Sequence, residues 1–316
     1  MTVLLWGVGT EPPMAMVGSA LADLGADVVL VHPREAAATE IVVRAGGGSA
    51  TVEGQLRVGP RTIDLAEVVG IYLRPVEPEL VPELAGLPSS SPVVGHARKI
   101  HDALIGFTEV AARATGARVL NRLSAMASNM SKPFQAQAVL RNGFSTPETV
   151  VTDDADEAIE FATGFDRVIY KSTSGIRSIV TLFDPVADRE RLRNLAWCPV
   201  QFQEFVSGYE IRVHVVGNET YAAQVKTTAT DYRYARRQVG DDAELSAVTL
   251  EPHLAARCVA LAADLDLPFA GLDLKIADDG RIVCFEVNPS PGFPWYETEA
   301  GLPISAAVAR HLVGAS

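Results

Sequence analysis

The sequence predicts a mixed fold, with an open parallel α/β part at the amino-terminal end and α+β parts after it. Residues 3–31 read as strand, helix and strand, the order that produces a parallel pair of strands. Beyond residue 121, strands separated by turn signals predominate, which is typical of antiparallel pairing. The 316 residues are 48% hydrophobic and 21% charged, the mixture of a folded globular protein.

Charge and cysteine spacing exclude several classes of protein. The formal net charge of −12 disfavours nucleic acid and anionic membranes as partners, because like charges repel. No apolar run approaches the roughly 18 residues of a membrane-spanning helix, and the first residues do not resemble a signal peptide, so we expect a cytoplasmic protein. Cys198, Cys258 and Cys284 are spaced for neither a disulfide framework nor a zinc site, which predicts buried thiols.

Apolar patterns and turn residues define the elements of the first part. We expect a strand at 3–8, a helix at 14–25, a strand at 26–31, a β-ribbon at 41–58, a strand near 70–74, a loop at 77–92, a helix at 94–115 and a strand at 117–121. Gly7 and Gly9 resemble the start of a dinucleotide-binding fingerprint. Its third glycine and its acidic residue are missing, so we expect no NAD or FAD.

The second part carries more strands than helices. We expect helices at 131–142, 154–164, 252–265 and 304–313, a strand, turn and strand at 168–183, and strands at 147–152, 200–206, 210–217, 219–227, 271–277 and 281–288.

Asp273, Glu286 and Asn288 form the strongest cluster of candidate ligands. The segments around the two carboxylates are strand-like, and Asp279–Gly280 between them predicts a hairpin turn. Glu286 and Asn288 are two residues apart and therefore project from one face. An oxygen-only set with few carboxylates suits Mg²⁺, which retains water and accepts phosphate oxygens. A solvent-facing hairpin is the alternative, but the apolar neighbours of Glu286 argue against it, because an unpaired carboxylate among them is costly.

Lys171 ends an apolar strand and precedes a Ser/Gly-rich loop that contains Ser174. Such a loop can bring an ammonium group and backbone N–H groups to phosphate oxygens. The pattern matches neither a Walker loop nor a kinase glycine loop, so alone it is weak evidence. Only 5 of the 27 basic residues are lysines, which favours each of them, Lys132 included, as a functional candidate.

Two further segments carry candidate anion-binding residues. Glu210 and Arg212 share one face of a predicted strand, which fits either a ribose or phosphate contact or an ordinary surface ion pair. Lys226 precedes a segment in which Arg233 and other arginines alternate with tyrosines. We interpret residues 227–240 as a loop that closes on an anion, and a solvated run of charges is the alternative.

In sequence order these motifs resemble the ATP-grasp superfamily. The matching segments are Lys132, Lys171-Ser-Thr-Ser-Gly, Gln203-Glu-Phe-Val, Gly-Tyr-Glu210-Ile-Arg212-Val, Gly-Leu-Asp273-Leu and Phe-Glu286-Val-Asn288-Pro-Ser-Pro-Gly. Within the superfamily, the chain resembles the RimK-like carboxylate–amine ligases, which are relatives of glutathione synthetase. It also resembles the ATP-grasp peptide maturases that crosslink ribosomally made peptides. The resemblance is strong over about 121–316 and loose before that.

The resemblance implies an ATP-grasp fold in three parts. Residues 1–120 would form the amino-terminal α/β pre-ATP-grasp domain, 121–198 the central lid subdomain, and 199–316 the carboxy-terminal subdomain with the metal site. The two α+β subdomains would clasp ATP between them.

The resemblance also implies a role for each candidate residue. Nucleotide binding would involve Lys132, Lys171 and Ser174 at the phosphates, Gln203, Glu204 and Val206 at the adenine, and Glu210 at the ribose. The metal ligands would be Asp273, Glu286 and Asn288, holding two Mg²⁺ ions, with Mn²⁺ as an alternative. Catalytic roles at the transferred phosphoryl group and the acyl-phosphate would fall to Arg212, Lys226 and Arg233.

The implied activity is that of an ATP-dependent carboxylate–amine ligase of the acid–amino-acid type. It would form an amide through an acyl-phosphate and release ADP and phosphate. Small-molecule or peptide carboxylates and amines would be its substrates, and a homodimer is compatible with the sequence. The alternatives are a maturase that crosslinks a ribosomal precursor peptide, a small-molecule kinase and a non-catalytic nucleotide sensor. Trp295 and Tyr296, where many glutamate ligases carry other residues, predict a wider and more aromatic acceptor pocket.

Overall fold

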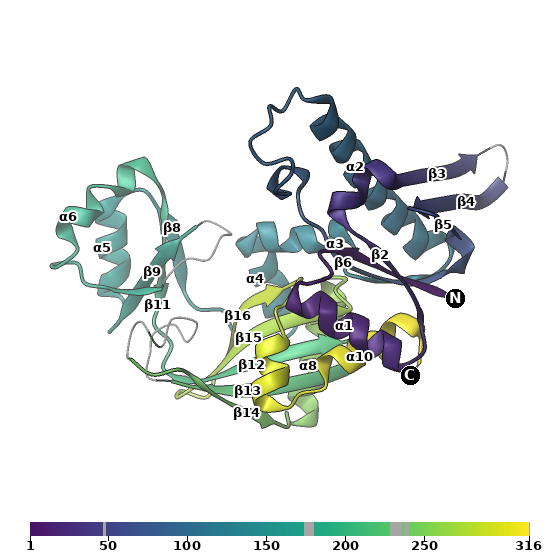
Figure 1. The fold of residues 1–316 in the computed structure, drawn as a ribbon. Coiled ribbons are helices and arrows are strands. Elements are labelled where there is room, and N and C mark those ends of the chain that lie inside the picture. The colour runs from purple at the N-terminus through teal and green to yellow at the C-terminus, as the bar shows by residue number, and fades with distance from the viewer. Residues whose placement is uncertain (47–48, 174–179, 228–235, 237–239, 316) are drawn as a thin grey trace.

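The computed structural model describes residues 1–46, 49–173, 180–227, 236 and 240–315, and its amino-terminal part is built on a parallel sheet (Figure 1). The strand order β2-β1-β6-β7 places β2 on one side of β1 and β6 on the other. The elements are β1 Thr2–Gly7, α1 Pro12–Asp23, β2 Asp27–Val31, β6 Val68–Arg74 and β7 Arg118–Leu120. Two prolines begin α1. Their missing N–H groups cost the helix nothing, because the N–H groups of the first turn have no partner within a helix.

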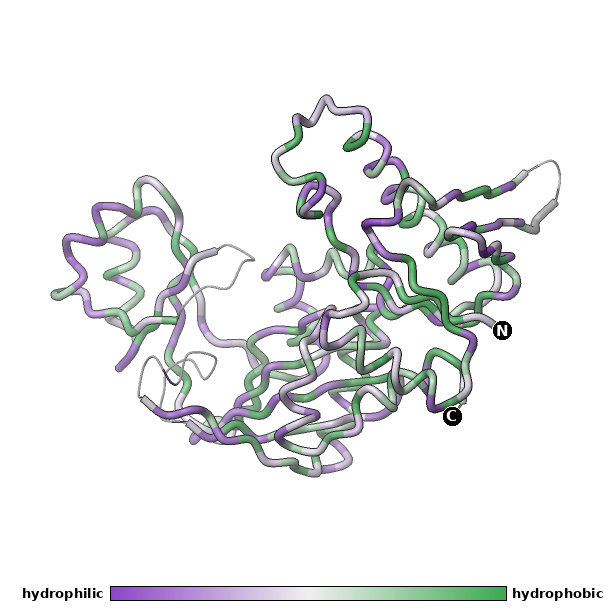
Figure 2. Tube along the Cα trace, in the orientation of Figure 1, coloured by the Kyte–Doolittle hydropathy of each residue, from purple (hydrophilic) through white to green (hydrophobic). Residues whose placement is uncertain are grey.

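A small antiparallel sheet and a long helix pack against this parallel sheet. The strand order is β3-β4-β5. The elements are β3 Thr39–Gly46, β4 Ser49–Val58, β5 Arg61–Asp64 and α2 Pro92–Ala114. Leu4 and Ile71 of the parallel sheet share one apolar cluster with Leu56 of β4 and Phe107 of α2. The strands of the parallel sheet are correspondingly apolar in Figure 2.

A second, central body contains a four-stranded antiparallel sheet in the order β10-β9-β11-β8. Its elements are β8 Thr149–Thr152, α5 Ala155–Thr163, β9 Val168–Ser172, β10 Thr181–Phe183, α6 Arg189–Leu192 and β11 Val200–Glu204. Val168 and Phe202 on one face of this sheet pack against Ala158 of α5. Because side chains alternate along a strand, Ile169, Lys171 and Gln203 point to the opposite face, and these three line a cavity.

The largest sheet has five antiparallel strands in the order β14-β13-β12-β15-β16. The elements of this body are α3 Leu123–Met126, α4 Lys132–Arg141, β12 Gly208–Val216, β13 Glu219–Lys226, β14 Glu244–Val248, α8 Pro252–Asp264, β15 Phe269–Ala277, β16 Ile282–Asn288, α9 Pro294–Ala300 and α10 Ile304–Val313. Alternation along β12 sends Ile211, Val213 and Val215 toward α4 and α8. It sends Val216 to the other face, toward α9 and α10.

Helix α10 joins the parallel sheet to the five-stranded sheet. Val308 and Leu312 of this helix share one apolar cluster with Leu5 of β1 and Val216 of β12. The helix approaches β6 so closely that a Cβ atom at Gly70 would lie 2.5 Å from the carbonyl oxygen of Leu312. The two sheets therefore have a common core.

The strands and helices expected from the sequence are present, and several elements were not expected. These are β5, β14, α9 and the short helices α3 and α6, together with 3-10 helices at Pro33–Ala38, Leu65–Glu67, Pro78–Leu80, Ala127–Met130 and Leu195–Trp197. The domain boundaries at residues 120 and 198 stay a prediction. Among the described residues, no helix is both long and apolar enough to cross a membrane.

Replacing Gly70 by alanine tests the contact between α10 and β6. The added methyl group would meet the backbone of Leu312, so we expect Gly70→Ala to lower the free energy of unfolding by about 1–3 kcal/mol. Gly106→Ala is the matched control, because Gly106 lies inside α2 with no atom within 4 Å of the new Cβ. Helix propensity should make that variant more stable by about 0.5–1 kcal/mol. Urea denaturation measures the free energy of unfolding of both variants. A midpoint of Gly70→Ala equal to that of the wild type would contradict the close packing at Gly70.

Candidate functional site

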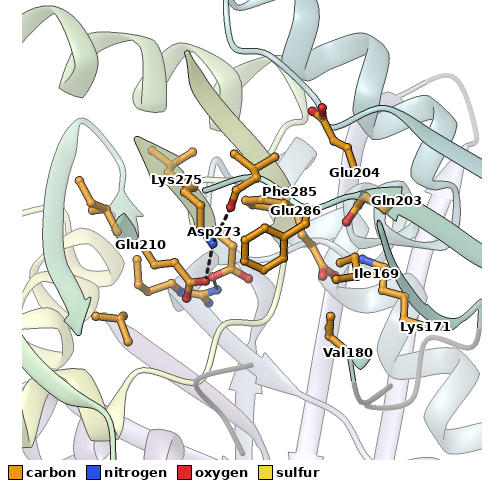
Figure 3. A pocket seen from close by; sticks show the side chains of 16 residues that line it. Ile169, Lys171, Val180, Gln203, Glu204, Glu210, Asp273, Lys275, Phe285 and Glu286 are labelled. Atoms are coloured by element: carbon orange, nitrogen blue, oxygen red, sulfur yellow. Dashed lines mark hydrogen bonds and ion pairs between the residues drawn. The ribbon is translucent and has the colours of Figure 1, made fainter. Parts of the chain in front are cut away.

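A cavity lies between the central sheet and the five-stranded sheet (Figure 3). Strands β9 and β11 contribute Ile169, Lys171 and Gln203 to one wall. The other wall is formed by residues of the five-stranded sheet, namely Glu210, Ile211, Arg212, Val225, Asp273, Leu274, Lys275, Phe285 and Glu286. Apolar side chains are thus interleaved with charges of both signs.

Two ion pairs hold the end of the cavity next to β11. Glu204 ends β11, is 8% exposed, and accepts a hydrogen bond of 2.9 Å from Nη1 of Arg281. Nζ of Lys275 lies 3.1 Å from Oε1 of Glu210 and donates to the carbonyl oxygen of Val206 at 3.3 Å. Lys275 therefore connects β12, β15 and the segment after β11, which keeps this wall in one arrangement.

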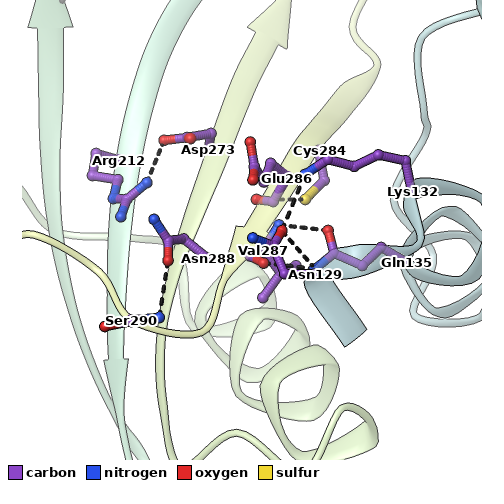
Figure 4. Close-up of polar contacts among 10 residues, drawn as sticks. All are labelled: Asn129, Lys132, Gln135, Arg212, Asp273, Cys284, Glu286, Val287, Asn288 and Ser290. Carbon is purple, nitrogen blue, oxygen red and sulfur yellow. Dashed lines mark hydrogen bonds and ion pairs between the residues drawn. The ribbon is translucent and has the colours of Figure 1, made fainter. Parts of the chain in front are cut away.

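Asp273 and Glu286 face each other directly across β15 and β16. Like charges in opposite positions of a sheet repel each other. Each carboxylate is accordingly paired with a cation (Figure 4): Nη1 of Arg212 donates to Oδ1 of Asp273 at 2.6 Å, and Nζ of Lys132 donates to Oε1 of Glu286 at 2.6 Å. The two cations come from β12 and from the start of α4.

Arg212 occupies a nearly closed site beneath Asp273. Its side chain is 6% exposed, and its guanidinium lies 5.8 Å from the centre of the Tyr296 ring. Gly271 leaves the room for this side chain, because a Cβ atom there would overlap Nη2 of Arg212. His214, two residues along β12, packs edge-on against Tyr296 at 4.9 Å. Burial, with the charge of Arg212 as a second cause, holds the pKa of His214 well below its ordinary value.

Helix α4 covers the outer edge of β16. Its Gln135 donates from Nε2 to the carbonyl oxygen of Val287 at 2.7 Å and accepts from the N–H of Val287 at 3.3 Å. Further along the edge, the N–H of Cys284 donates to the carbonyl oxygen of Ser145 at 2.9 Å. A glutamine side chain and one residue of a connecting segment thus satisfy backbone groups that a sixth strand would otherwise bind.

The donors at the end of this hairpin fit a hard divalent cation. Asp273, Glu286 and Asn288 offer only oxygen ligands from two adjacent strands, and two basic side chains already lie against the carboxylates. Among the described residues, no group of three or more His, Cys, Asp and Glu side chains could hold a metal ion. An ion here would therefore need Asn288, water and phosphate oxygens as further ligands, which is the coordination typical of Mg²⁺.

The structure brings most of the predicted site residues together. Eight of them line the cavity: Lys171, Gln203, Glu204, Val206, Glu210, Arg212, Asp273 and Glu286. Lys132 reaches the cavity wall through Glu286, and Asn288 lies beside Arg212 (Figure 4). Lys226 is exposed at the end of β13 and is not part of the lining. Ser174, Arg233 and most of the expected 227–240 loop lie outside the described residues.

The sequence favours Lys275 only as one of five lysines, and it does not predict Gln135 or Arg281 as site residues. Lys275 is two residues after Asp273 on one strand, and Gln135 is three residues after Lys132 on one helix. Both spacings place the pair on a common face, which is the signal that could have identified them. Arg281 offers no such signal, because its partner Glu204 belongs to a different sheet.

A known protein family matches most of the part of the chain that forms the cavity. The model of the RimK-like ATP-grasp domain covers residues 130–312. Among curated proteins, human N-acetylaspartylglutamate synthase A is 26% identical over 212 residues, which cover 62% of this chain and 52% of that protein. This chain therefore spans about half the length of such relatives.

Solved structures match the chain from end to end. One is the macrocyclase MdnC of Microcystis aeruginosa MRC, bound with the precursor peptide MdnA, at a TM-score of 0.77 and 20% identity over 99% of this chain and 100% of that one. Another is a RiPP-associated ATP-grasp ligase of Chryseobacterium gregarium, in complex with ADP and a leader and core peptide, at a TM-score of 0.79 and 18% identity over 100% and 97%. At these identities the likeness establishes the fold, and the predicted fold class is confirmed.

Thiol labelling tests the burial of the strand that carries Glu286. The prediction of buried thiols is confirmed for Cys258 and Cys284 and is wrong for Cys198, which is exposed. Burial raises the pKa of Cys258 to about 12 and also raises the pKa of Cys284. Since the thiolate is the reactive form, we expect a chromogenic disulfide reagent at pH 8 to label one thiol per native chain. Cys198→Ser should then react only in denaturant, and rapid labelling of a second native thiol would contradict the structure.

Proposed function

Because this chain belongs to the RimK-like ATP-grasp family, we propose that it is an ATP-dependent carboxylate–amine ligase. The observation that carries the proposal is the cavity between two antiparallel sheets. Lys171 lines it from the central sheet, while Arg212 and the facing carboxylates Asp273 and Glu286 line it from the five-stranded sheet. A cation on one wall, with a cation and oxygen ligands on the other, fits a nucleoside triphosphate with its metal.

The nucleotide would lie along the cavity from β11 to the Asp273–Glu286 pair. Gln203, Glu204 and the backbone at Val206 would hold the adenine, where the wall next to β11 is braced by Arg281 and Lys275. Glu210 would bind the ribose. Lys171 and Lys132 would contact the phosphates from opposite sides, because one is on β9 and the other on α4. Ser174 is proposed for the same phosphates.

Asp273, Glu286 and Asn288 would hold Mg²⁺, which we propose binds as two ions and can be replaced by Mn²⁺. When bound, the metal would neutralise charge on the phosphate oxygens. In the absence of a ligand, Lys132 and Arg212 balance the two carboxylates. Lys132 can turn from Glu286 to a phosphate oxygen, since its side chain is 46% exposed.

The reaction would proceed in two displacements. A carboxylate oxygen of the acid substrate attacks the γ-phosphorus of ATP, and the bond to ADP breaks. The amine nitrogen then attacks the acyl carbon, phosphate leaves, and the amine loses a proton. Arg212, Lys226 and Arg233 would neutralise the charge that develops on the phosphoryl and acyl oxygens. No protein nucleophile is needed, and Cys284, the thiol nearest the carboxylates in sequence, is buried.

A peptide substrate is the second candidate, and the extent of the structural match favours it. The peptide-bound macrocyclase and the peptide-bound ligase match this chain over 99% and 100% of its length, including the amino-terminal sheet. The curated sequence relative covers only 62% of the chain. We therefore propose that the acid and the nucleophile can be peptide side chains. An amine as nucleophile would give an amide, and a hydroxyl group would give an ester.

A hydroxylamine assay tests the proposed function. The protein is supplied with Mg-ATP, a panel of amino acids and small acids, and hydroxylamine in place of the unknown amine. We expect a hydroxamate to form in step with ADP, which would establish the acyl-phosphate and name the acid. ADP together with a stable phosphorylated product would instead make the protein a kinase. ADP formation only when a precursor peptide is added would assign it to the peptide maturases.

Glu286→Gln tests the metal role within that assay. The substitution keeps the shape of the side chain but removes one of two facing carboxylates, so we expect turnover to fall at least 100-fold, about 2.7 kcal/mol in activation free energy. The fold should be retained, because the lost ion pair with Lys132 is half exposed. Glu299→Gln, the same change at an exposed position of α9, is the control. Wild-type turnover in Glu286→Gln would remove the metal assignment.

A further inference from the structure

The two residues that follow Asn288 are each held by a side chain from the amino-terminal parallel sheet. Asn121, directly after β7, donates from Nδ2 to the carbonyl oxygen of Pro289 at 2.6 Å. Arg74, the last residue of β6, donates from Nη1 to Oγ of Ser290 at 2.8 Å. Since β6 and β7 are neighbouring parallel strands, the segment after Asn288 is attached at two consecutive positions to the carboxyl ends of these strands.

Arg74 is itself held in one orientation. Its Nε and Nη2 donate to Oε1 of Glu11 at 2.8 and 2.6 Å. The Arg74 side chain is 17% exposed and that of Glu11 33%, so the pair is shielded from most solvent. Glu11 immediately precedes α1, and Gly7, at the end of β1, is the register partner of Arg74. A Cβ atom at Gly7 would lie 2.7 Å from the carbonyl oxygen of Arg74, so the two strands approach closely here.

Asn121 joins the same segment to the strand that carries Asp273. Its Oδ1 accepts from the N–H of Phe269 at 3.0 Å, and its Nδ2 also donates to the carbonyl oxygen of Phe269. Phe269 is the first residue of β15, and Asn121 is 2% exposed. One buried amide therefore fixes the start of β15 against the end of β16.

Ser290 transmits this attachment to the side chain of Asn288. The N–H of Ser290 donates to Oδ1 of Asn288 at 2.9 Å (Figure 4). This hydrogen bond holds the amide of Asn288 in one orientation, because rotating the amide would break it. A series of hydrogen bonds runs from Glu11 through Arg74 and Ser290 to Asn288, across 216 residues of sequence between Arg74 and Ser290.

We infer that Arg74, through Ser290, is a positioning residue for the divalent metal at Asn288, with Asn121 as the second point of attachment. The inference rests on the metal role of Asn288 in the proposed function. The amino-terminal sheet then contributes to the metal site without supplying a ligand. The physical reason is that a ligand held by a hydrogen bond loses less freedom on binding, and losing such outer contacts typically lowers metal affinity about 10–100-fold.

The test uses Ser290→Ala and Arg74→Gln in the full chain. Mn²⁺ binding to the ADP complex is followed by the electron paramagnetic resonance signal of free Mn²⁺, and ADP binding without metal is followed by calorimetry. We expect the dissociation constant of Mn²⁺ to rise about tenfold in both variants, with metal-free ADP affinity unchanged. Arg57→Gln is the matched control, because Arg57 forms an exposed ion pair with Glu40 in the same part of the chain. The double variant should bind Mn²⁺ with the same dissociation constant as the single variant that binds it less tightly, since both changes break one series of contacts.

Two results would overturn the inference. Mn²⁺ affinity within twofold of wild type in both variants would show that the attachment does not affect the metal. An equal loss of metal-free ADP affinity would show a general disturbance of the cavity instead. Asn288→Ala, measured alongside, separates this inference from the proposed function. If Asn288→Ala binds Mn²⁺ as tightly as wild type, the metal role of Asn288 is wrong and the inference falls with it, whereas the ligase activity is still decided by the hydroxylamine assay. If only Asn288→Ala weakens binding, the inference alone fails.

Discussion

The site depends on two carboxylates, Asp273 and Glu286, that face each other across neighbouring strands. Their mutual repulsion has to be offset by cations, and several features of the fold provide them. Arg212 fits beneath Asp273 only because Gly271 has no side chain. Lys132 reaches Glu286 only because α4 lies along the edge of β16. The placement of Arg212 and Lys132 against this hairpin therefore meets one electrostatic requirement.

The same requirement explains why charges of both signs alternate along the cavity. Glu204 pairs with Arg281, Glu210 with Lys275, Asp273 with Arg212 and Glu286 with Lys132. Each acidic residue thus has a basic partner from another element. A polyanionic ligand would compete with the carboxylates for these cations, and a metal ion would compete with the cations for the carboxylates. Nucleotide and metal should accordingly bind together more favourably than either alone. The nucleotide takes the cations that the metal displaces from the carboxylates, and the metal takes the carboxylates that lose their cations to the nucleotide.

Local patterns in the sequence identified the hairpin that carries Asp273, Glu286 and Asn288 and the positions of most strands along the chain. Period-two spacing was sufficient for Glu286 and Asn288, since residues two apart on a strand must share a face. The partners of these residues could not be predicted in this way. Arg281 pairs with Glu204 across two sheets, and Arg74 bonds Ser290 across 216 residues, so both contacts depend on how separate bodies dock. Helix α9 was missed because a proline-rich segment precedes it, and β14 because its sequence alternates weakly.

Helix α10 has a consequence for the order in which the protein can fold as it is made. It supplies core residues to the parallel sheet, whose first strand begins at Thr2, yet its own residues are Ile304–Val313. While a nascent chain is still short of this helix, Leu5 and Gly70 lack the surface they pack against in the finished protein. The face of the amino-terminal sheet that contacts α10 therefore cannot complete its core before residues 304–313 have been made, unlike a domain that folds as soon as it leaves the ribosome. Until then, α1 covers this face of β1 through Met14, Val17 and Leu21.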